Sequence, residues 1–334
     1  MAVANADLKL FRSVVTDDTA ANGGRLSTSQ IQSGVVEALF PDADEAEQAA
    51  GSQKHRKLFV ANHANPSEVA YGARVFLENY TPASDENIFF AASQTDTQAG
   101  ITGAEDKFGV GQLDADVSAG ASSIDVSVHD WANLPIFRNG VLLRISDKAD
   151  IDAPGNTEFI YVHASTAISA AANVVTIPLA TNLVGSYLAA NTRVASVLDH
   201  GVLETTIDNW VETSTLGTYD EGTYPVAGDN LGTIEQIWTF TWSDGSNFTV
   251  SGDTIGSVGS GTIGADFSPN NPDYSAPYFT LEQEGFAGTW ANGDTLVFHT
   301  HPANIPLWML RDIPAGTTPQ SGNKSVLVLK TGSA

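Results

Sequence analysis

The chain has no cysteine among its 334 residues. Disulfide bonds, thiolate metal sites and cysteine nucleophiles are therefore excluded, so packing or association between chains must stabilise the fold. The absence of cysteine leaves the redox compartment of the protein undetermined.

Positive charge is also scarce. Lys and Arg number 15 against 39 Asp and Glu, which gives a formal net charge of −24. Such a chain is poorly suited to binding nucleic acid, because phosphate contacts need Lys and Arg. The same charge disfavours anionic membrane surfaces. It promotes solubility and says nothing about the fold.

Long apolar runs and familiar catalytic motifs are missing as well. No apolar stretch approaches the length of a membrane-crossing helix. The opening M-A-V-A-N-A-D-L-K-L-F lacks a basic region followed by an apolar run, so we expect no signal peptide. The chain has no G-x-S-x-G elbow, Walker A loop or H-E-x-x-H motif. We therefore predict a protein that is not an enzyme and carries no cofactor.

What the chain does contain is a series of short apolar runs separated by turn-forming residues. In V-A-Y-G-A-R-V-F-L, apolar side chains alternate with a two-residue period, as in a half-buried strand. Asn139-Gly140 and Asp244-Gly245 lie between apolar flanks and predict hairpins, the first of type I′. The polar, Gly-rich residues 92–112 read as a linker. A capping box at Ser27 predicts one short helix, which Pro41 ends.

Two groups of residues could bind a metal ion. His299 and His301 lie two apart on a predicted strand, which places both rings on one face, but a site needs a third ligand. The alternative is two polar residues on the wet face of that strand. The second group has the oxygen ligands that calcium favours, in a register that is not an EF-hand; an ordinary turn is the alternative. Its members are Asp150, Asp152, Asn156 and Glu158.

Two further patterns are weaker. Glu282 and Glu284 are expected on one strand face, at a spacing that permits glycoside hydrolysis but is common on solvated faces. Gly259, Gly261 and Gly264 match G-x-G-x-x-G without the flanking strand and helix of a dinucleotide site. We interpret that segment as a flexible Gly/Ser loop.

Both ends of the chain resemble a known family. R-K-L-F-V-A-N-H-A-N with V-A-Y-G-A-R-V-F-L-E-N-Y, and P-L-W-M-L-R-D-I-P-A-G-T with its closing V-L-V-L, resemble immunoglobulin-like sandwich modules of tailed-bacteriophage virion proteins. The front section, G-G-R-L-S-T-S-Q-I-Q-S-G-V-V-E-A-L-F-P-D, is similar to structural proteins of phage tails and necks, and the middle loosely resembles small β-barrels of tail proteins. The resemblance implies a virion component and carries over no catalytic residue.

Together these patterns predict a mainly β protein. We expect several antiparallel β-sandwich or barrel modules, a mostly irregular N-terminal arm and little helix. The expected parts are an arm at 1–53, an immunoglobulin-like sandwich from 54–112 plus 295–334, a small inserted barrel or sandwich at 113–200, and a second β insertion at 201–294.

The charge pattern near residue 50 suggests how such a subunit could assemble. A cluster of basic residues closely follows an acidic one, and opposite strips on two faces would give contacts between copies a direction. The alternative is pairing of the two clusters within one chain. The candidate contact residues are Asp42, Asp44, Glu45, Glu47, Lys54, Arg56 and Lys57.

The function expected from these arguments is structural. The chain would form part of a phage tail, neck or baseplate by ring-like self-assembly, with copies of itself and other virion proteins as partners, in a virion assembled in the host cytoplasm. One alternative is a glycan-binding or glycan-cleaving surface protein, and another is a capsid decoration protein. The first alternative could use tryptophans as sugar platforms, although most are expected in cores. Those tryptophans are Trp131, Trp238, Trp242, Trp290 and Trp308.

Overall fold

The computed structural model describes residues 3–35, 37–65, 67–80, 86–318 and 324–332. Antiparallel β-strands make up nearly all of its regular structure, so the mainly β prediction is confirmed. Within the described residues no helix is long and apolar enough to cross a membrane. The helical elements of this part are α1 (Glu45–Ala50) and the 3-10 turns η1 (Asn5–Asp7), η2 (Gln98–Gly100) and η3 (Gln283–Gly285).

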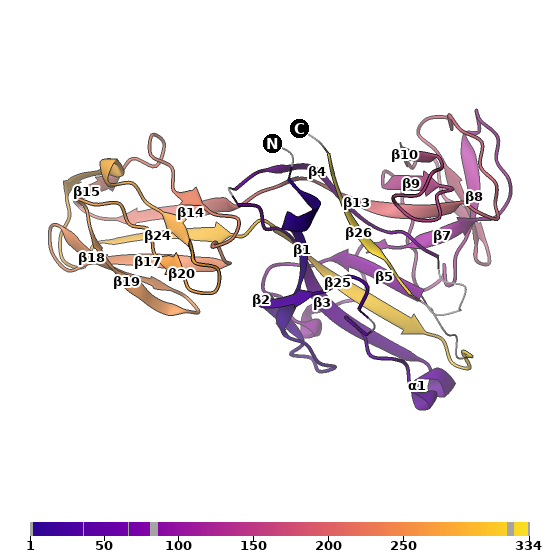
Figure 1. Cartoon of the computed structure of the whole chain (residues 1–334), viewed down its shortest axis with the longest axis horizontal. Coiled ribbons are helices and arrows are strands. Elements are labelled where there is room, and N and C mark those ends of the chain that lie inside the picture. The colour runs from indigo at the N-terminus through magenta and orange to yellow at the C-terminus, as the bar shows by residue number, and fades with distance from the viewer. Residues whose placement is uncertain (1–2, 36, 66, 81–85, 319–323, 333–334) are drawn as a thin grey trace.

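A six-stranded sheet forms the centre of the molecule (Figure 1). It joins distant parts of the chain, because β25 from the C-terminal region lies between β3 and β5. In spatial order its strands are β2 (Gly23–Ile31), β1 (Leu8–Val15), β3 (Ser52–Asn62), β25 (Asn304–Ile313), β5 (Glu86–Ala91) and β6 (Lys107–Phe108).

The N-terminal region is more regular than the sequence indicates. Strands β1 and β2 form a hairpin, and β1 also pairs with β3. The predicted helix after Ser27 is wrong, because residues 27–31 continue β2 and pair with β1. Pairing completes the backbone ladder and buries Phe11, which outweighs a weak helical pattern interrupted by Gly34 at φ +76°.

A nine-stranded sheet adjoins the first. The first half of β13 pairs with β9 and β7, and its second half pairs with β4, which in turn pairs with β26. This one long strand therefore joins the β4–β26 pair to the other strands of the sheet. The strands are β4 (Ala70–Leu77), β7 (Val110–Leu113), β8 (Ser123–Ser127), β9 (Leu142–Ser146), β10 (Thr157–Tyr161), β11 (Ser169–Ala171), β12 (Val174–Pro178), β13 (Arg193–Leu203) and β26 (Leu327–Gly332).

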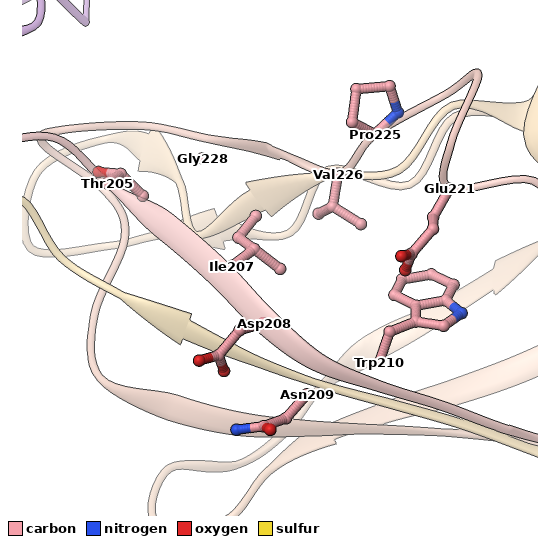
Figure 2. A pocket seen from close by; sticks show the side chains of 9 residues that line it. All are labelled: Thr205, Ile207, Asp208, Asn209, Trp210, Glu221, Pro225, Val226 and Gly228. Atoms are coloured by element: carbon pink, nitrogen blue, oxygen red, sulfur yellow. The ribbon is translucent and has the colours of Figure 1, made fainter.

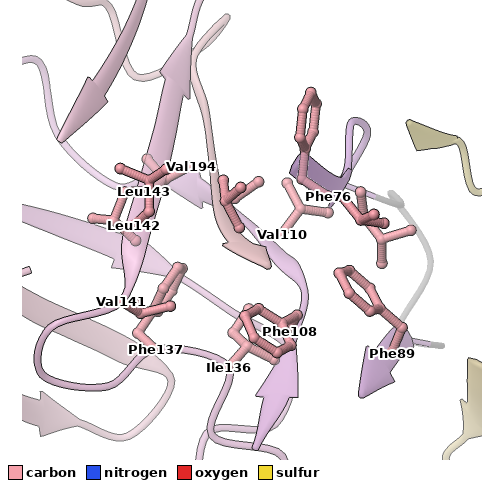
Figure 3. Packing of buried hydrophobic residues seen from close by; sticks show 14 of the residues in the cluster. Phe76, Phe89, Phe108, Val110, Ile136, Phe137, Val141, Leu142, Leu143 and Val194 are labelled. Carbon is pink, nitrogen blue, oxygen red and sulfur yellow. The ribbon is translucent and has the colours of Figure 1, made fainter. Parts of the chain in front are cut away.

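These two sheets share one hydrophobic core. It includes Leu307 of the six-stranded sheet together with Val75 and Leu143 of the nine-stranded sheet, all fully buried. Figure 3 shows where the sheets meet, with the rings of Phe89 and Phe108 stacked at 5.1 Å between centroids. The regions expected to form a sandwich and an inserted barrel thus pack as one unit, which we call the body.

Residues 206–301 form a second unit, the lobe, which projects from the body at the left of Figure 1. Its separate core is mostly aromatic, with Trp242 and Trp290 stacked at 3.8 Å. The main sheet has the order β14 (Thr206–Thr213), β24 (Thr295–His301), β17 (Gln236–Trp242), β18 (Asn247–Gly252) and β19 (Gly256–Thr262). Short ladders join β15 (Leu216–Tyr219) to β23 (Phe286–Thr289), β16 (Ala227–Gly228) to β22 (Phe279–Thr280), and β20 (Asn270–Asn271) to β21 (Ala276–Pro277).

The lobe begins and ends close to the expected boundaries, but β24 belongs to it and not to the 295–334 part of the sandwich. It contacts the body at the Arg25–Asp253 ion pair, 2.7 Å. The ring of His63 lies 5.0 Å from Phe11 of the body and 4.8 Å from Tyr274 of the lobe. Burial lowers the pKa of His63 to about 4, so its ring is neutral at this junction near neutral pH.

Candidate functional site

The basic cluster of β3 is engaged within the chain. Lys57 is fully buried, and its ammonium group lies 2.6 Å from the Asp96 carboxylate and donates to the Gly24 carbonyl at 2.7 Å. Arg56, also buried, lies 2.5 Å from Asp18. Lys54 forms an ion pair with Glu47. Pairing within one chain is therefore what the structure shows for these three cations.

Cationic side chains of the central sheet also bind the segment around Phe40 and Pro41, which precedes β3. The Phe40 ring contacts two guanidinium groups, at 5.7 Å from Arg56 and 5.2 Å from Arg311. Arg311 also donates to the Pro41 carbonyl at 2.5 Å. The cations beside an acidic cluster thus fix a chain segment on the sheet, an arrangement that needs no second copy.

The acidic residues of the cluster behave differently from the basic ones. Asp44 caps α1 by accepting from the Glu47 backbone N–H at 2.7 Å. Asp42, Asp44 and Glu45 are exposed, whereas Glu47 is half-buried. A contact between copies at the exposed carboxylates remains a prediction, but it has no free basic strip on β3 as its counterpart.

The oxygen-ligand group is not assembled into a metal site. Asp150 accepts the backbone N–H groups of Asp152 and Ala153 at 3.0 and 2.9 Å, as in an ordinary turn. Asn156 binds Asp147 instead, through its backbone N–H at 2.5 Å. The Glu158 carboxylate accepts from Val184 N, Gly185 N and the Tyr187 hydroxyl. Among the described residues no group of three or more His, Cys, Asp and Glu could hold a metal ion.

The histidine pair is clamped by polar groups. His301 Nδ1 lies 2.9 Å from Glu235, and its Nε2 lies 3.2 Å from Asp208. His299 lies on the same side of β24, with ring centroids 6.5 Å apart, and contacts the Asn209 amide at 3.3 Å. Since both nitrogens of His301 meet carboxylates, a protonated ring is the state that fits this clamp, and such a ring has no lone pair for a metal.

The clamp predicts a pH dependence of lobe stability. The hydrogen bond to Glu235, together with the charges of Glu235 and Asp208, raises the pKa of His301 from 6.5 to about 9 despite its burial. A raised folded-state pKa stabilises fully below pH 6.5, and this contribution falls as the pH rises and is lost above about pH 9. Because Asp208 is exposed, we expect a change on the order of 2 kcal/mol.

Denaturant unfolding of the lobe across this pH window measures the effect. His301→Gln should remove most of the slope, whereas His299→Gln, two residues away on the same face, should keep it. If the free energy of unfolding depended on pH equally in the two variants, the contacts of His301 with Glu235 and Asp208 would not be the source of the pH dependence.

The two weaker sequence patterns are corrected by the structure. Glu282 immediately precedes the 3-10 turn η3 and Glu284 lies within it, so the two residues do not share a strand face. Gly259 and Gly261 belong to β19, so that segment is a strand and not a loop. Gly261 lies where a Cβ atom would meet the Phe248 and Phe267 rings at 2.7 Å, so packing requires this glycine.

Beside the clamp lies a surface hollow of about 310 Å³, between β14 and the segment that leads to β16 (Figure 2). Ile207, Val226 and Trp210 give it apolar walls, and Glu221 places a carboxylate on it. This lining suits a small neutral or cationic group and not an anion.

No sequence motif marks this hollow. Its residues come from two separate segments, and Trp210 stands in a sequence context that gives no sign of a binding site. The Trp210 ring is stacked 5.5 Å from Phe298 and lies 5.3 Å from Tyr219, so neighbouring rings already occupy its surroundings. Asn209, which follows Asp208, has φ +53° at a bulge of β14. No local pattern in the sequence indicates that bulge.

The tryptophans considered as sugar platforms are mostly core residues. Trp238, Trp242, Trp290 and Trp308 are at most 1 % exposed. Trp131 is half-buried against the body core. The four buried rings offer no surface for stacking on a saccharide.

Comparison with known proteins adds no identification. No family model, no curated protein and no solved structure matches this chain.

Proposed function

We propose that this chain is a non-enzymatic structural subunit of a tailed-phage particle, part of the tail, neck or baseplate, that works by associating with copies of itself and with other virion proteins. The observation that carries the proposal is the build of the molecule. Strands from both ends of the chain interlock in one body, and a lobe with its own core projects from it. Such a unit suits repeated packing in a shell, because the body sets position while the lobe presents free surface.

The resemblance of both chain ends to virion sandwich modules supports the same proposal. The segments that carry it become adjacent strands: β3 with β25, and β4 with β26. Ring-like assembly in the host cytoplasm, ending in the virion, completes the proposal. A glycan-related function has less support, because four of the five tryptophans considered for it are buried.

Immunogold labelling tests the proposal. Antibodies against the recombinant chain should label purified particles of the phage that encodes it, at the tail, neck or baseplate. Label on the capsid would favour the decoration alternative. Particles without label, and without peptides of this chain by mass spectrometry, would reject a virion function.

A further inference from the structure

Strand β19 is an uncharged edge of the lobe sheet. A sheet edge exposes unpaired backbone N–H and C=O groups, which proteins usually shield with charge, proline, bulges or short length. In the described part of the chain β19 pairs with β18 on one side and with no strand on the other. Its sequence, G-S-V-G-S-G-T, has neither charge nor proline, and most of its residues are exposed.

The outer strands of the three larger sheets in the described structure are otherwise shielded by charge or by short length. At the opposite edge of the same sheet, β14 carries Asp208 and Glu212 and a bulge. Strands β2, β10 and β26 each contain a charged residue, and β6 and β11 have only two and three residues. Strand β19 is therefore the longest uncharged edge among those described.

Charge indicates which partner this edge fits. The run from Thr254 to Ala265 is uncharged and lies between Asp253 and Asp266, in a chain of net charge −24. Two copies repel each other, and they approach at least electrostatic cost where each is neutral. A basic partner would be drawn to the acidic faces instead. The neutral edge thus favours a second copy of this chain.

The ladder fixes which backbone groups of β19 face outward. Ile263 N donates to Ser246 O at 2.9 Å, one position beyond the Thr262–Asn247 pair. Hydrogen-bonded and non-bonded pairs alternate in an antiparallel ladder, so the N–H and C=O groups of Ser260 and Thr262 point away from β18. The Thr262 C=O accepts from Ala265 N at 3.3 Å and has a second lone pair for a partner strand. A register shift lies before Gly259, which leaves residues 259–262 as the regular part of the edge.

We propose that two copies of this chain pair antiparallel through residues 259–262 of β19, about a two-fold axis at Gly261. Ser260 of each copy then lies opposite Thr262 of the other, and each such pair exchanges both backbone hydrogen bonds. The two five-stranded sheets become one continuous sheet. The inference rests on the proposed function, since it names a self-contact of the assembling subunit; a ring requires a further, heterologous contact.

Exposed hydroxyl groups continue across this edge. Thr241, Thr249 and Ser260 are consecutive cross-strand partners on the outer face of β17, β18 and β19, and all three are exposed. Pairing at β19 extends this uncharged row into the second copy. Strands β17, β18 and β19 contain no Asp or Glu, so none of their side chains would bring negative charge to the contact between the two copies.

Sedimentation of the full-length chain over a wide concentration range tests the contact. The unchanged chain should form a dimer. Ser260→Pro removes an outward N–H without touching the β18 ladder, and should weaken the dimer about tenfold or more, since each copy loses one donor. Ser260→Ala, which keeps that N–H, is the matched control and should dimerise as the unchanged chain does.

A second variant keeps the test decisive if Ser260→Pro does not fold. Ser260→Glu combined with Thr262→Glu sets like charges directly opposite across the two-fold axis, and should leave a folded monomer. A monomer at every concentration for the unchanged chain would overturn the proposal, as would a dimer that both variants leave intact. The two proposals can fail separately. If the chain dimerised through β19 but were absent from phage particles, the virion function would be rejected and the β19 contact would be supported.

Discussion

Asp96→Ala should lower the free energy of unfolding of the body by about 3–5 kcal/mol, because it leaves the buried Lys57 ammonium group without its carboxylate. Lys57 is 0 % exposed, and burial lowers its pKa although Asp96 acts in the opposite direction. The Asp96 carboxylate also accepts from Trp308 Nε1 at 3.1 Å, so a second buried donor loses its partner. Denaturant unfolding followed by tryptophan fluorescence measures the loss.

Asp18→Ala is the matched control for this prediction. Asp18 pairs with Arg56 and Lys54, but its side chain is 53 % exposed. Arg56 is buried but also donates to the Asp17 and His55 carbonyls, and solvent reaches the Asp18 side of the pair. A smaller loss than for Asp96→Ala is therefore expected. Similar losses in the two variants would mean that the full burial of Lys57 does not make its carboxylate partner more important for stability.

Trp290→Ala should destabilise the lobe by about 3–5 kcal/mol and leave the unfolding of the body unchanged. Trp290 is buried against Trp242, and its ring also lies where a Cβ on Gly217 would come within 2.3 Å. Because the two hydrophobic cores are separate clusters, each should give its own transition in calorimetry.

Trp131→Ala provides the comparison, since Trp131 packs against the body core and is half-buried. It should shift the body transition by a smaller amount and spare that of the lobe. A single transition that moves with both substitutions would contradict the separation of the two units.

Local signals in the sequence predicted strands better than their partners. The Asp244-Gly245 hairpin is confirmed, as β17 and β18 pair across it. Asn139-Gly140 does form a tight turn, with Val141 N donating to Arg138 O at 3.2 Å, but Asn139 lacks the positive φ of type I′ and no strand precedes the turn. Turn residues indicate where the chain reverses direction. Strand pairing depends on which distant strand lies alongside, and turn residues carry no information about that strand.

The candidate sites were harder to predict for the same reason. The polar segment 92–112 read as a linker, yet its Asp96 holds Lys57 inside the body. His301 was noticed for its spacing from His299, but its carboxylate partners lie 66 and 93 positions away, at Glu235 and Asp208. When the side chains of a site come from strands far apart in the sequence, no short sequence motif identifies them.

The place of β25 between β3 and β5 bears on the order in which the chain acquires its structure during synthesis. The central sheet cannot close until residues 304–313 have left the ribosome, because β25 supplies the strand between its two halves. Residues 206–301 contain the whole lobe sheet and emerge earlier. Since domains generally fold as units during synthesis, we expect the lobe to fold first. Until β25 emerges, the apolar strands of the body remain unpaired, and in this interval the chain is most prone to aggregation and to chaperone binding.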